Sequence, residues 1–195
     1  MFLNNKFKIF EFLFIFILLP ILFVIKIIPI YFVVPILWII SFYALIVLKK
    51  DYTIEFFEKI NLKDLKYILF RFILISSIIT LFTYVFFEEY LFSFMIEKPK
   101  MYFLVMIFYP ILSVIPQEFI FRKFFFKRYS FYFSSNMFLL LNTFCFSWAH
   151  IIFNNYLAVI FTLIGGYLFA QTYKKTNTFS LVCIEHILYG ILLFT

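Results

Sequence analysis

The chain of 195 residues is 66% hydrophobic and 26% aromatic, and only 14% of its residues are charged. A soluble domain of this size could not bury so much apolar surface, so the composition predicts an all-α, polytopic bundle of transmembrane helices. The net charge of +7 does not indicate a nucleic-acid-binding protein, because the basic residues gather at the ends of apolar runs, as in membrane proteins.

Apolar runs along the chain predict about seven membrane spans. We expect the spans near residues 9–25, 27–48, 67–87, 101–121, 135–153, 156–173 and 178–195. The chain is too short to add a second folded domain, so we expect residues 1–195 to form a single transmembrane domain. Residues 49–66 mix charges with apolar side chains, and this pattern predicts an amphipathic helix at the cytoplasmic surface.

The distribution of lysine and arginine predicts the orientation in the membrane. If the N-terminus is cytoplasmic, the inner ends of the spans carry Lys6, Lys8, Lys49, Lys50, Lys59, Lys63, Lys66, Arg71, Arg122, Lys123, Lys127, Arg128, Lys174 and Lys175. The outer ends then carry only Lys26, Lys98 and Lys100. Because basic residues favour the cytoplasmic side, we expect a multi-pass protein of the cell membrane with a cytoplasmic N-terminus.

Four ionisable side chains, those of Glu118, Arg122, His150 and His186, fall inside the apolar runs. A charged group at bilayer depth costs about 2.5 to 3.5 kcal/mol on insertion scales. The two histidines are the only ones in the chain. Residues kept at this cost indicate a buried polar site, and carboxylate with imidazole is the set of groups that hydrolysis by an activated water requires.

Glu118 and Arg122 are one helical turn apart with the acid first, the favoured order for an ion pair on one helix face. Arg122 would then keep Glu118 ionised and able to accept a proton from water. The same spacing also suits an interfacial ion pair that only anchors a helix end, and this alternative stays open. Pro116 predicts a kink two residues before Glu118, because proline lacks the N–H that would bond the carbonyl of Leu112.

The two histidines lie on separate predicted spans, which favours their convergence on one site. Imidazole can position or protonate a water, stabilise an oxyanion or bind a metal. The alternative is that each histidine makes an unrelated contact between helices. Glu185 precedes His186 and points about 100 degrees around the helix, so we expect it to contact a basic group on another helix.

Taken together, the motifs resemble the CPBP family of intramembrane proteases, which includes type II CAAX prenyl endopeptidases and bacterial Abi-type proteins. The motifs are E-x-x-x-R from Glu118 to Arg122, F-x-x-x-H from Phe146 to His150, and a last motif from His186 to Gly190. Each falls on its own hydrophobic segment, and the resemblance covers about residues 103–195.

Two positions depart from the usual family pattern. Gln117 stands where the first of two adjacent glutamates is usual, and Gly190 stands where an asparagine is usual. In both variants the chain is similar to a bacterial subgroup of the family. We therefore expect either that Glu118 has taken over the role of the base or that activity has been lost.

The resemblance implies a catalytic set of Glu118, Arg122, His150 and His186, with Gln117, Phe146 and Gly190 in support. Glu118 would activate water, the histidines would bind or polarise the water and the scissile carbonyl, and Arg122 would orient the carboxylate. Two histidines and one glutamate suit either a zinc site with an open position or a metal-free site, and both remain open.

The leading hypothesis is an intramembrane endopeptidase that hydrolyses membrane-associated or lipidated peptides. Its partners would be the lipid bilayer and a peptide or protein substrate, with no nucleic acid. A non-catalytic immunity or scaffold protein of the same family is a second hypothesis, which Gln117 permits. A small proton-coupled transporter is a third, because buried glutamate and histidine also relay protons through membranes.

Overall fold

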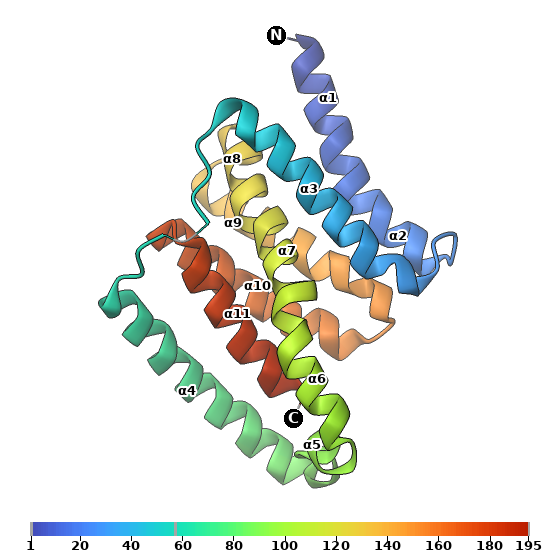
Figure 1. Ribbon diagram of the computed structural model, residues 1–195, viewed down its shortest axis with the longest axis vertical. Coiled ribbons are helices and arrows are strands. Elements are labelled where there is room, and N and C mark those ends of the chain that lie inside the picture. The colour runs from blue at the N-terminus through green and yellow to red at the C-terminus, as the bar shows by residue number, and fades with distance from the viewer. Residues whose placement is uncertain (1, 57, 195) are drawn as a thin grey trace. The chain divides into compact units, whose positions relative to one another are not determined.

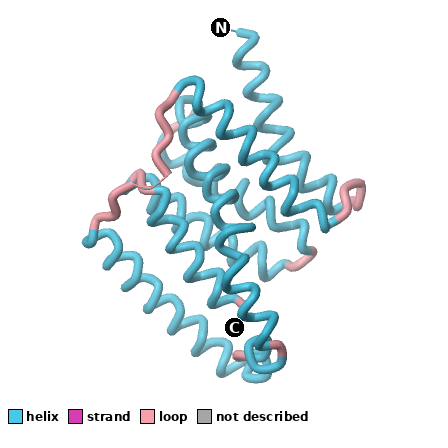
Figure 2. Tube along the Cα trace, in the orientation of Figure 1, coloured by secondary structure: helices cyan, strands magenta, loops and turns pink. Residues whose placement is uncertain are grey.

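The computed structural model describes residues 2–56 and 58–194, and every regular element in this part of the chain is a helix (Figure 2). Six helical stretches in it are long and apolar enough to cross a membrane: Asn5–Val24, Ile30–Lys50, Leu62–Phe86, Pro99–Tyr132, Ser135–Phe153 and Tyr156–Thr176. A seventh apolar helix, Phe179–Leu193, has 15 residues. The prediction of an all-α, multi-pass membrane protein is therefore confirmed.

The helices group into two compact units, each made of two separate stretches of chain. Unit 1 contains Met1–Thr53 and Phe119–Gln171, and unit 2 contains Ile54–Glu118 and Thr172–Thr195. The single transmembrane domain expected from the chain length stays a prediction.

Unit 1 begins with a helical hairpin (Figure 1). The helices of unit 1 are α1 (Phe2–Phe12), α2 (Leu19–Val24), α3 (Val33–Asp51), α8 (Phe125–Tyr129), α9 (Ser135–Trp148) and most of α10 (Tyr156–Thr176). A π-helical turn, Leu13–Leu18, joins α1 to α2, and the turn before α3 contains Lys26 in a left-handed conformation with φ of 62°. The first two spans are therefore antiparallel neighbours.

Aromatic rings fill the core of unit 1. Phe16 is buried and packs edge-on against Phe121 and Phe125, with ring centroids 5.4 and 5.0 Å apart. Buried Glu11 fastens the N-terminal helix, because it accepts hydrogen bonds from Arg128 at 2.9 and 3.1 Å and from the Tyr129 hydroxyl at 2.7 Å. These contacts hold the stretch that carries Arg122 against the first span.

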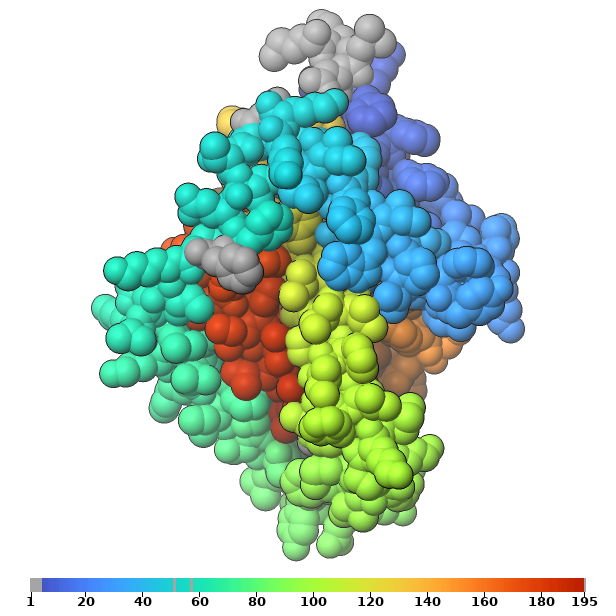
Figure 3. Space-filling model, viewed as in Figure 1, coloured from blue at the N-terminus to red at the C-terminus, as the bar shows by residue number. Residues whose placement is uncertain are grey.

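Unit 2 is arranged around α11 (Phe179–Leu193). The other helices of the unit are α4 (Leu62–Phe86), α5 (Ser93–Glu97), α6 (Pro99–Tyr109), α7 (Ile115–Glu118) and the last turn of α10. Helix α11 contacts both α4 and α7. In the space-filling view, the red surface of α11 lies between the green surface of α4 and the yellow-green surface of α6 (Figure 3).

The amphipathic helix expected over residues 49–66 is wrong. Helix α3 ends at Asp51, residues 52–56 and 58–61 are not helical, and α4 begins at Leu62, where the Asn61 side chain accepts a hydrogen bond from the Lys63 N–H at 2.9 Å. The intervening segment instead caps α11. Glu58 accepts the Phe179 N–H at 3.1 Å, as carboxylates favour at a helix N-terminus.

The stretch before Glu118 is distorted, although one turn earlier than the sequence predicted. Pro110–Val114 is π-helical, and the Ile115 N–H bonds to the Pro110 carbonyl five residues back. Proline and π-helical turns both deflect a helix, and such turns often accompany functional sites. The distortion ends directly before α7, which carries Gln117 and Glu118.

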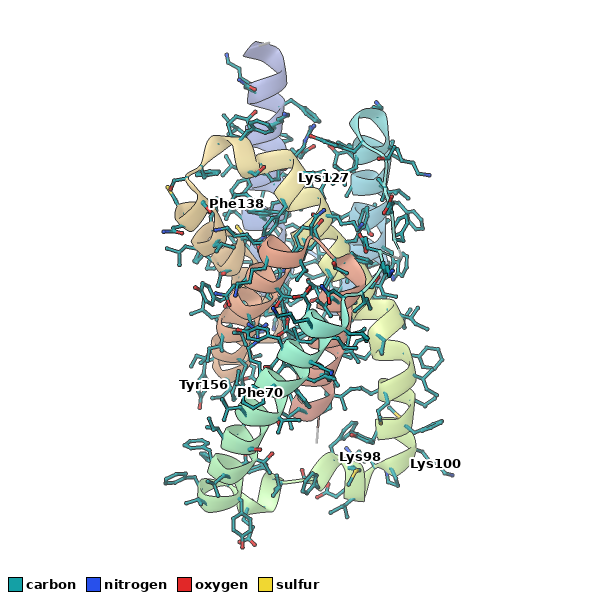
Figure 4. All side chains as sticks on the ribbon, turned by 90° about the vertical axis from the view of Figure 1, so that its left-hand side faces the viewer. Phe70, Lys98, Lys100, Lys127, Phe138 and Tyr156 are labelled. Carbon is teal, nitrogen blue, oxygen red and sulfur yellow. The ribbon has the colours of Figure 1, made fainter. Side chains whose placement is uncertain are left out.

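Side chains on the outside of unit 2 suit a lipid environment. Phe70, labelled on α4 in Figure 4, is 69% exposed. Lys98 and Lys100 lie together where α5 passes into α6, at one end of the unit (Figure 4). Apolar flanks and basic ends are the arrangement expected of membrane helices.

Candidate active site

The structure brings two of the predicted site residues of unit 2 together. Glu118 ends α7 with 0% of its surface exposed, and His186 lies in the middle of α11 with 6% exposed. The His186 Nδ1–H donates to Glu118 Oε1 at 2.7 Å, across 68 positions of sequence. A buried carboxylate and a buried imidazole therefore form one hydrogen-bonded pair.

The other predicted histidine, His150, belongs to unit 1. It is half-buried in the 3₁₀ turn that follows α9, and its Nδ1 lies 2.8 Å from the carbonyl oxygen of Phe146. The His150 and Phe146 rings also pack together, with centroids 4.9 Å apart. The first and last residues of the F-x-x-x-H motif therefore contact each other, and Phe146 fixes the orientation of the His150 imidazole.

Both histidines are held in the same way, through Nδ1 on an oxygen acceptor. An acceptor at Nδ1 requires a proton on that nitrogen, so a neutral ring carries its lone pair on Nε2. Each imidazole is therefore set to accept a proton, or to bind an electrophile, through Nε2.

Arg122 is fully buried in unit 1, in the π-helical turn Phe119–Phe124. Its Nη1 donates to Asn142 Oδ1 at 2.6 Å, and its guanidinium carbon lies 5.0 Å from the centre of the Phe146 ring. The amide of Asn142 in turn donates to the Phe121 carbonyl at 2.7 Å. Planar donors and a flat face are properties of arginine that lysine lacks, which explains an arginine at this position.

Sequence reasoning missed Asn142 as a partner of Arg122. The signal was present, because an amide inside the apolar run 135–153 needs a hydrogen-bond partner in a membrane. Its side chain is 0% exposed. Gly166 also supports the arrangement, since a Cβ there would lie 2.9 Å from the Phe146 ring.

The supporting residues Gln117 and Gly190 both lie in unit 2. Gln117 donates from Nε2 to Ser113 Oγ at 2.6 Å, and its buried Oε1 has no hydrogen-bond partner among residues 2–56 and 58–194. Gly190 lies one turn after His186 on α11, and the hydroxyl of Tyr109 fills the space beside it. Residue 190 thus leaves room for a side chain that comes from another helix.

Glu185, beside His186, contacts a basic group on another helix, as the sequence predicted. Arg71 of α4 makes a short ion pair with Glu185 Oε1 and donates to Thr172 Oγ1 at 2.7 Å. The Thr172 hydroxyl donates to Glu185 Oε2 at 2.7 Å. This network fixes α11 next to the Glu118–His186 pair.

A metal site would need at least three suitable side chains close together. Within residues 2–56 and 58–194, no group of three or more His, Cys, Asp or Glu side chains has an arrangement that could hold a metal ion. Zinc therefore stays an untested prediction for Glu118, His150 and His186.

Comparison with known proteins relates residues 99–192 to one protein family. Residues 99–192 match the family model described as type II CAAX prenyl endopeptidase Rce1-like, a CPBP family. This segment contains all three motifs and both polar arrangements centred on Glu118 and Arg122. No curated protein and no solved structure shows a significant match to the chain. The match agrees with the resemblance inferred from the motifs over 94 of the 195 residues, and the bacterial subgroup stays a prediction.

Proposed function

We propose that the chain, which carries an Rce1-like type II CAAX prenyl endopeptidase domain over residues 99–192, is an intramembrane endopeptidase. The observation that carries the proposal is the buried hydrogen bond between Glu118 and His186. A carboxylate and an imidazole in contact, shielded from bulk water, can accept, hold and return a proton during hydrolysis. The substrates would be membrane-associated or lipidated peptides.

In the proposed reaction Glu118 is the base. It takes a proton from a water molecule as the water oxygen bonds to the scissile carbonyl carbon and the carbonyl electron pair moves to its oxygen. When the C–N bond breaks, the proton passes from Glu118 to the leaving nitrogen. His186 donates its Nδ1–H to the carboxylate and so orients it, and its Nε2 would serve as a second proton acceptor.

We assign supporting roles to the motif residues of unit 1 on the strength of the family match. His150, with its lone pair directed to Nε2, would polarise the water or the scissile carbonyl. Arg122 would orient the Glu118 carboxylate. Gln117, which replaces the usual first glutamate, would position water through its side-chain amide, because an amide cannot accept a proton from water.

The proposal is tested by cleavage in a membrane. Purified protein in lipid nanodiscs is incubated with a library of apolar membrane peptides and with a farnesylated peptide that ends in a CAAX box, and products are identified by mass spectrometry. Glu118→Gln keeps the size and most of the hydrogen bonding of the side chain but removes the basic carboxylate. We expect it to lower the cleavage rate by about 10²- to 10⁴-fold.

Glu89→Gln is the matched control, because Glu89 is exposed and lies in the short 3₁₀ helix Glu88–Tyr90 between α4 and α5. It should cleave at the wild-type rate. Wild-type activity in Glu118→Gln would remove this residue from the mechanism. If neither wild-type protein nor control cleaves any peptide, the non-catalytic role that Gln117 permits becomes the better hypothesis; proton flux coupled to a transported solute would favour the transporter.

A further inference from the structure

Tyr109 lies beside the Glu118–His186 pair, although no motif includes it. It ends α6, directly before the π-helical turn that starts at Pro110. Its ring packs edge-on against the His186 ring, with centroids 6.0 Å apart and an angle of 79° between the planes. On another side it packs edge-on against Phe194 at 5.2 Å. Two neighbours in the same unit therefore fix the direction of the phenol ring.

The Tyr109 hydroxyl occupies a space that exists because residue 190 is glycine. A Cβ added to Gly190 would overlap the Tyr109 Oη and the ring carbons next to it. His186 and Gly190 are four residues apart on α11, so they lie on the same face of the helix. The hydroxyl is thus held one helical turn along α11 from the imidazole.

The Tyr109 side chain is partly buried, and its hydroxyl is not one of the fully buried polar atoms that lack a partner. Across residues 2–56 and 58–194, it makes no hydrogen bond to another protein group. A rigid donor next to the proposed base is the kind of group that stabilises an oxygen on which negative charge develops.

We propose that Tyr109 is a further catalytic residue, which donates a hydrogen bond to the carbonyl oxygen of the scissile peptide bond. The assignment rests on the proposed function. As the water oxygen bonds to the carbonyl carbon, the carbonyl π electrons move to oxygen, and the Tyr109 O–H bonds to that oxyanion without transferring its proton. When the C–N bond breaks, the electrons return to form the carbonyl of the new carboxylic acid.

The decisive variant is Tyr109→Phe, which removes the hydroxyl and leaves both ring contacts in place. The assay is cleavage of the farnesylated CAAX-box peptide in nanodiscs, with kcat and KM measured separately. We expect kcat to fall by about 10²-fold, the usual effect of losing one oxyanion donor. KM should change by less than about threefold, because the bond strengthens only in the transition state.

Tyr102→Phe is the matched control on the same helix. The Tyr102 ring packs against Phe94, with centroids 6.1 Å apart, and not against α11. It should keep the wild-type kcat. Thermal unfolding of both variants shows whether folding is intact, and equal midpoints are expected because only a hydroxyl has been removed.

Gly190→Ala tests the position of the same hydroxyl, because the added methyl group must displace the Tyr109 side chain. It should lower kcat, and Gly190→Ala combined with Tyr109→Phe should lose little more than either change alone. In Tyr109→Ala combined with Gly190→Asn, an amide donor enters the vacated space, and part of the lost kcat should return relative to Tyr109→Ala.

The outcomes separate this assignment from the proposed function. If the wild-type protein cleaves the peptide and Tyr109→Phe keeps its kcat, Tyr109 is not a catalytic residue and the protease proposal stands. A drop in thermal stability together with unchanged kcat would assign Tyr109 a packing role and overturn the proposal. If the wild-type protein cleaves nothing, the proposed function fails and this assignment fails with it.

Discussion

The His186 Nδ1 lies 2.7 Å from Glu118 Oε1, and both side chains are buried. The two residues come from helices α7 and α11, which are in contact. The proposed base is therefore oriented by a helix that is distant in sequence, and its reactivity depends on how α11 is held. Arg71, Thr172 and Glu185 hold that helix.

Removal of both histidines tests whether they serve one reaction. His150→Ala and His186→Ala should each lower the cleavage rate by about 10²-fold or more, with the protein still folded in membranes. The double variant should lose little beyond the worse single one, because residues that act as a unit are strongly non-additive. The measurement is kcat/KM in nanodiscs for the four proteins. Independent, multiplicative losses would assign the two imidazoles separate roles.

Arg71 and Glu185 form a buried ion pair of unit 2, with 11% and 0% of their side-chain surfaces exposed. Arg71→Met leaves the Glu185 carboxylate buried without its cation and should destabilise the protein by about 3 to 5 kcal/mol. Adding Glu185→Leu removes the orphaned charge and should restore much of this loss. Thermal unfolding in nanodiscs provides the comparison.

The Arg71 prediction has a control in the same helix. Arg71 faces α11, whereas Lys66 is exposed near the start of α4. Lys66→Met should change the stability by no more than about 0.5 kcal/mol. If Arg71→Met unfolds at the same temperature as Lys66→Met, the Arg71–Glu185 ion pair does not contribute to the stability of the protein.

Much of the fold could be predicted from the sequence, because the bilayer restricts a spanning segment to helix. Runs of apolar residues therefore predicted most helix bounds to within about five residues, including the run 178–195, which corresponds to α11 (Phe179–Leu193). The exception is the run 101–121, because the helical stretch there continues from Pro99 to Tyr132. The segment at 52–61 could not be predicted in this way. The alternation of charged and apolar residues in this segment favours a helix. In the structure Glu58 instead caps α11 by accepting the Phe179 N–H, and Phe179 is 121 positions away in the sequence.

The site was partly predictable for a similar reason. Charged and imidazole side chains inside apolar runs are costly, so Glu118, Arg122 and His186 stood out. The specific partners did not, because Asn142 and Tyr109 are not ionised at neutral pH and occur widely in membrane helices. Which of them meets which motif residue depends on helix rotation and on the π-helical turns, and periodicity does not encode either.

The orientation in the membrane follows from the lysine and arginine count and can be measured directly. The two native cysteines, Cys145 and Cys183, are buried and are not joined in a disulfide, so a Cys145→Ala/Cys183→Ala background removes the native thiols. Lys6→Cys and Glu97→Cys are then made one at a time, at two exposed positions. An impermeant thiol reagent on intact cells should label position 97 and leave position 6 unlabelled. The opposite pattern would reverse the predicted orientation.

Arg122→Lys distinguishes a catalytic from an anchoring arginine. Lysine keeps the charge but loses the fork that reaches Asn142 and the flat face against Phe146. We expect the variant to lose about 1.5 to 3 kcal/mol of stability, the usual contribution of hydrogen bonds made by a charged group. If Arg122 orients the Glu118 carboxylate, kcat should also fall by more than about tenfold, because an ammonium group is held less rigidly than a guanidinium. Unfolding and single-turnover cleavage are measured on the same nanodisc preparation.

The control is the same exchange at Arg128, which also forms a buried pair, with Glu11 in unit 1. Arg128→Lys breaks its two-point contact with the carboxylate and should lower stability by a similar amount. It should leave kcat of the folded protein unchanged, because no motif residue contacts that pair. If Arg122→Lys behaves in the same way, losing stability and keeping kcat, then Arg122 only anchors its helix and the alternative left open by the one-turn spacing is correct. A loss of kcat confined to Arg122→Lys assigns the guanidinium to the reaction.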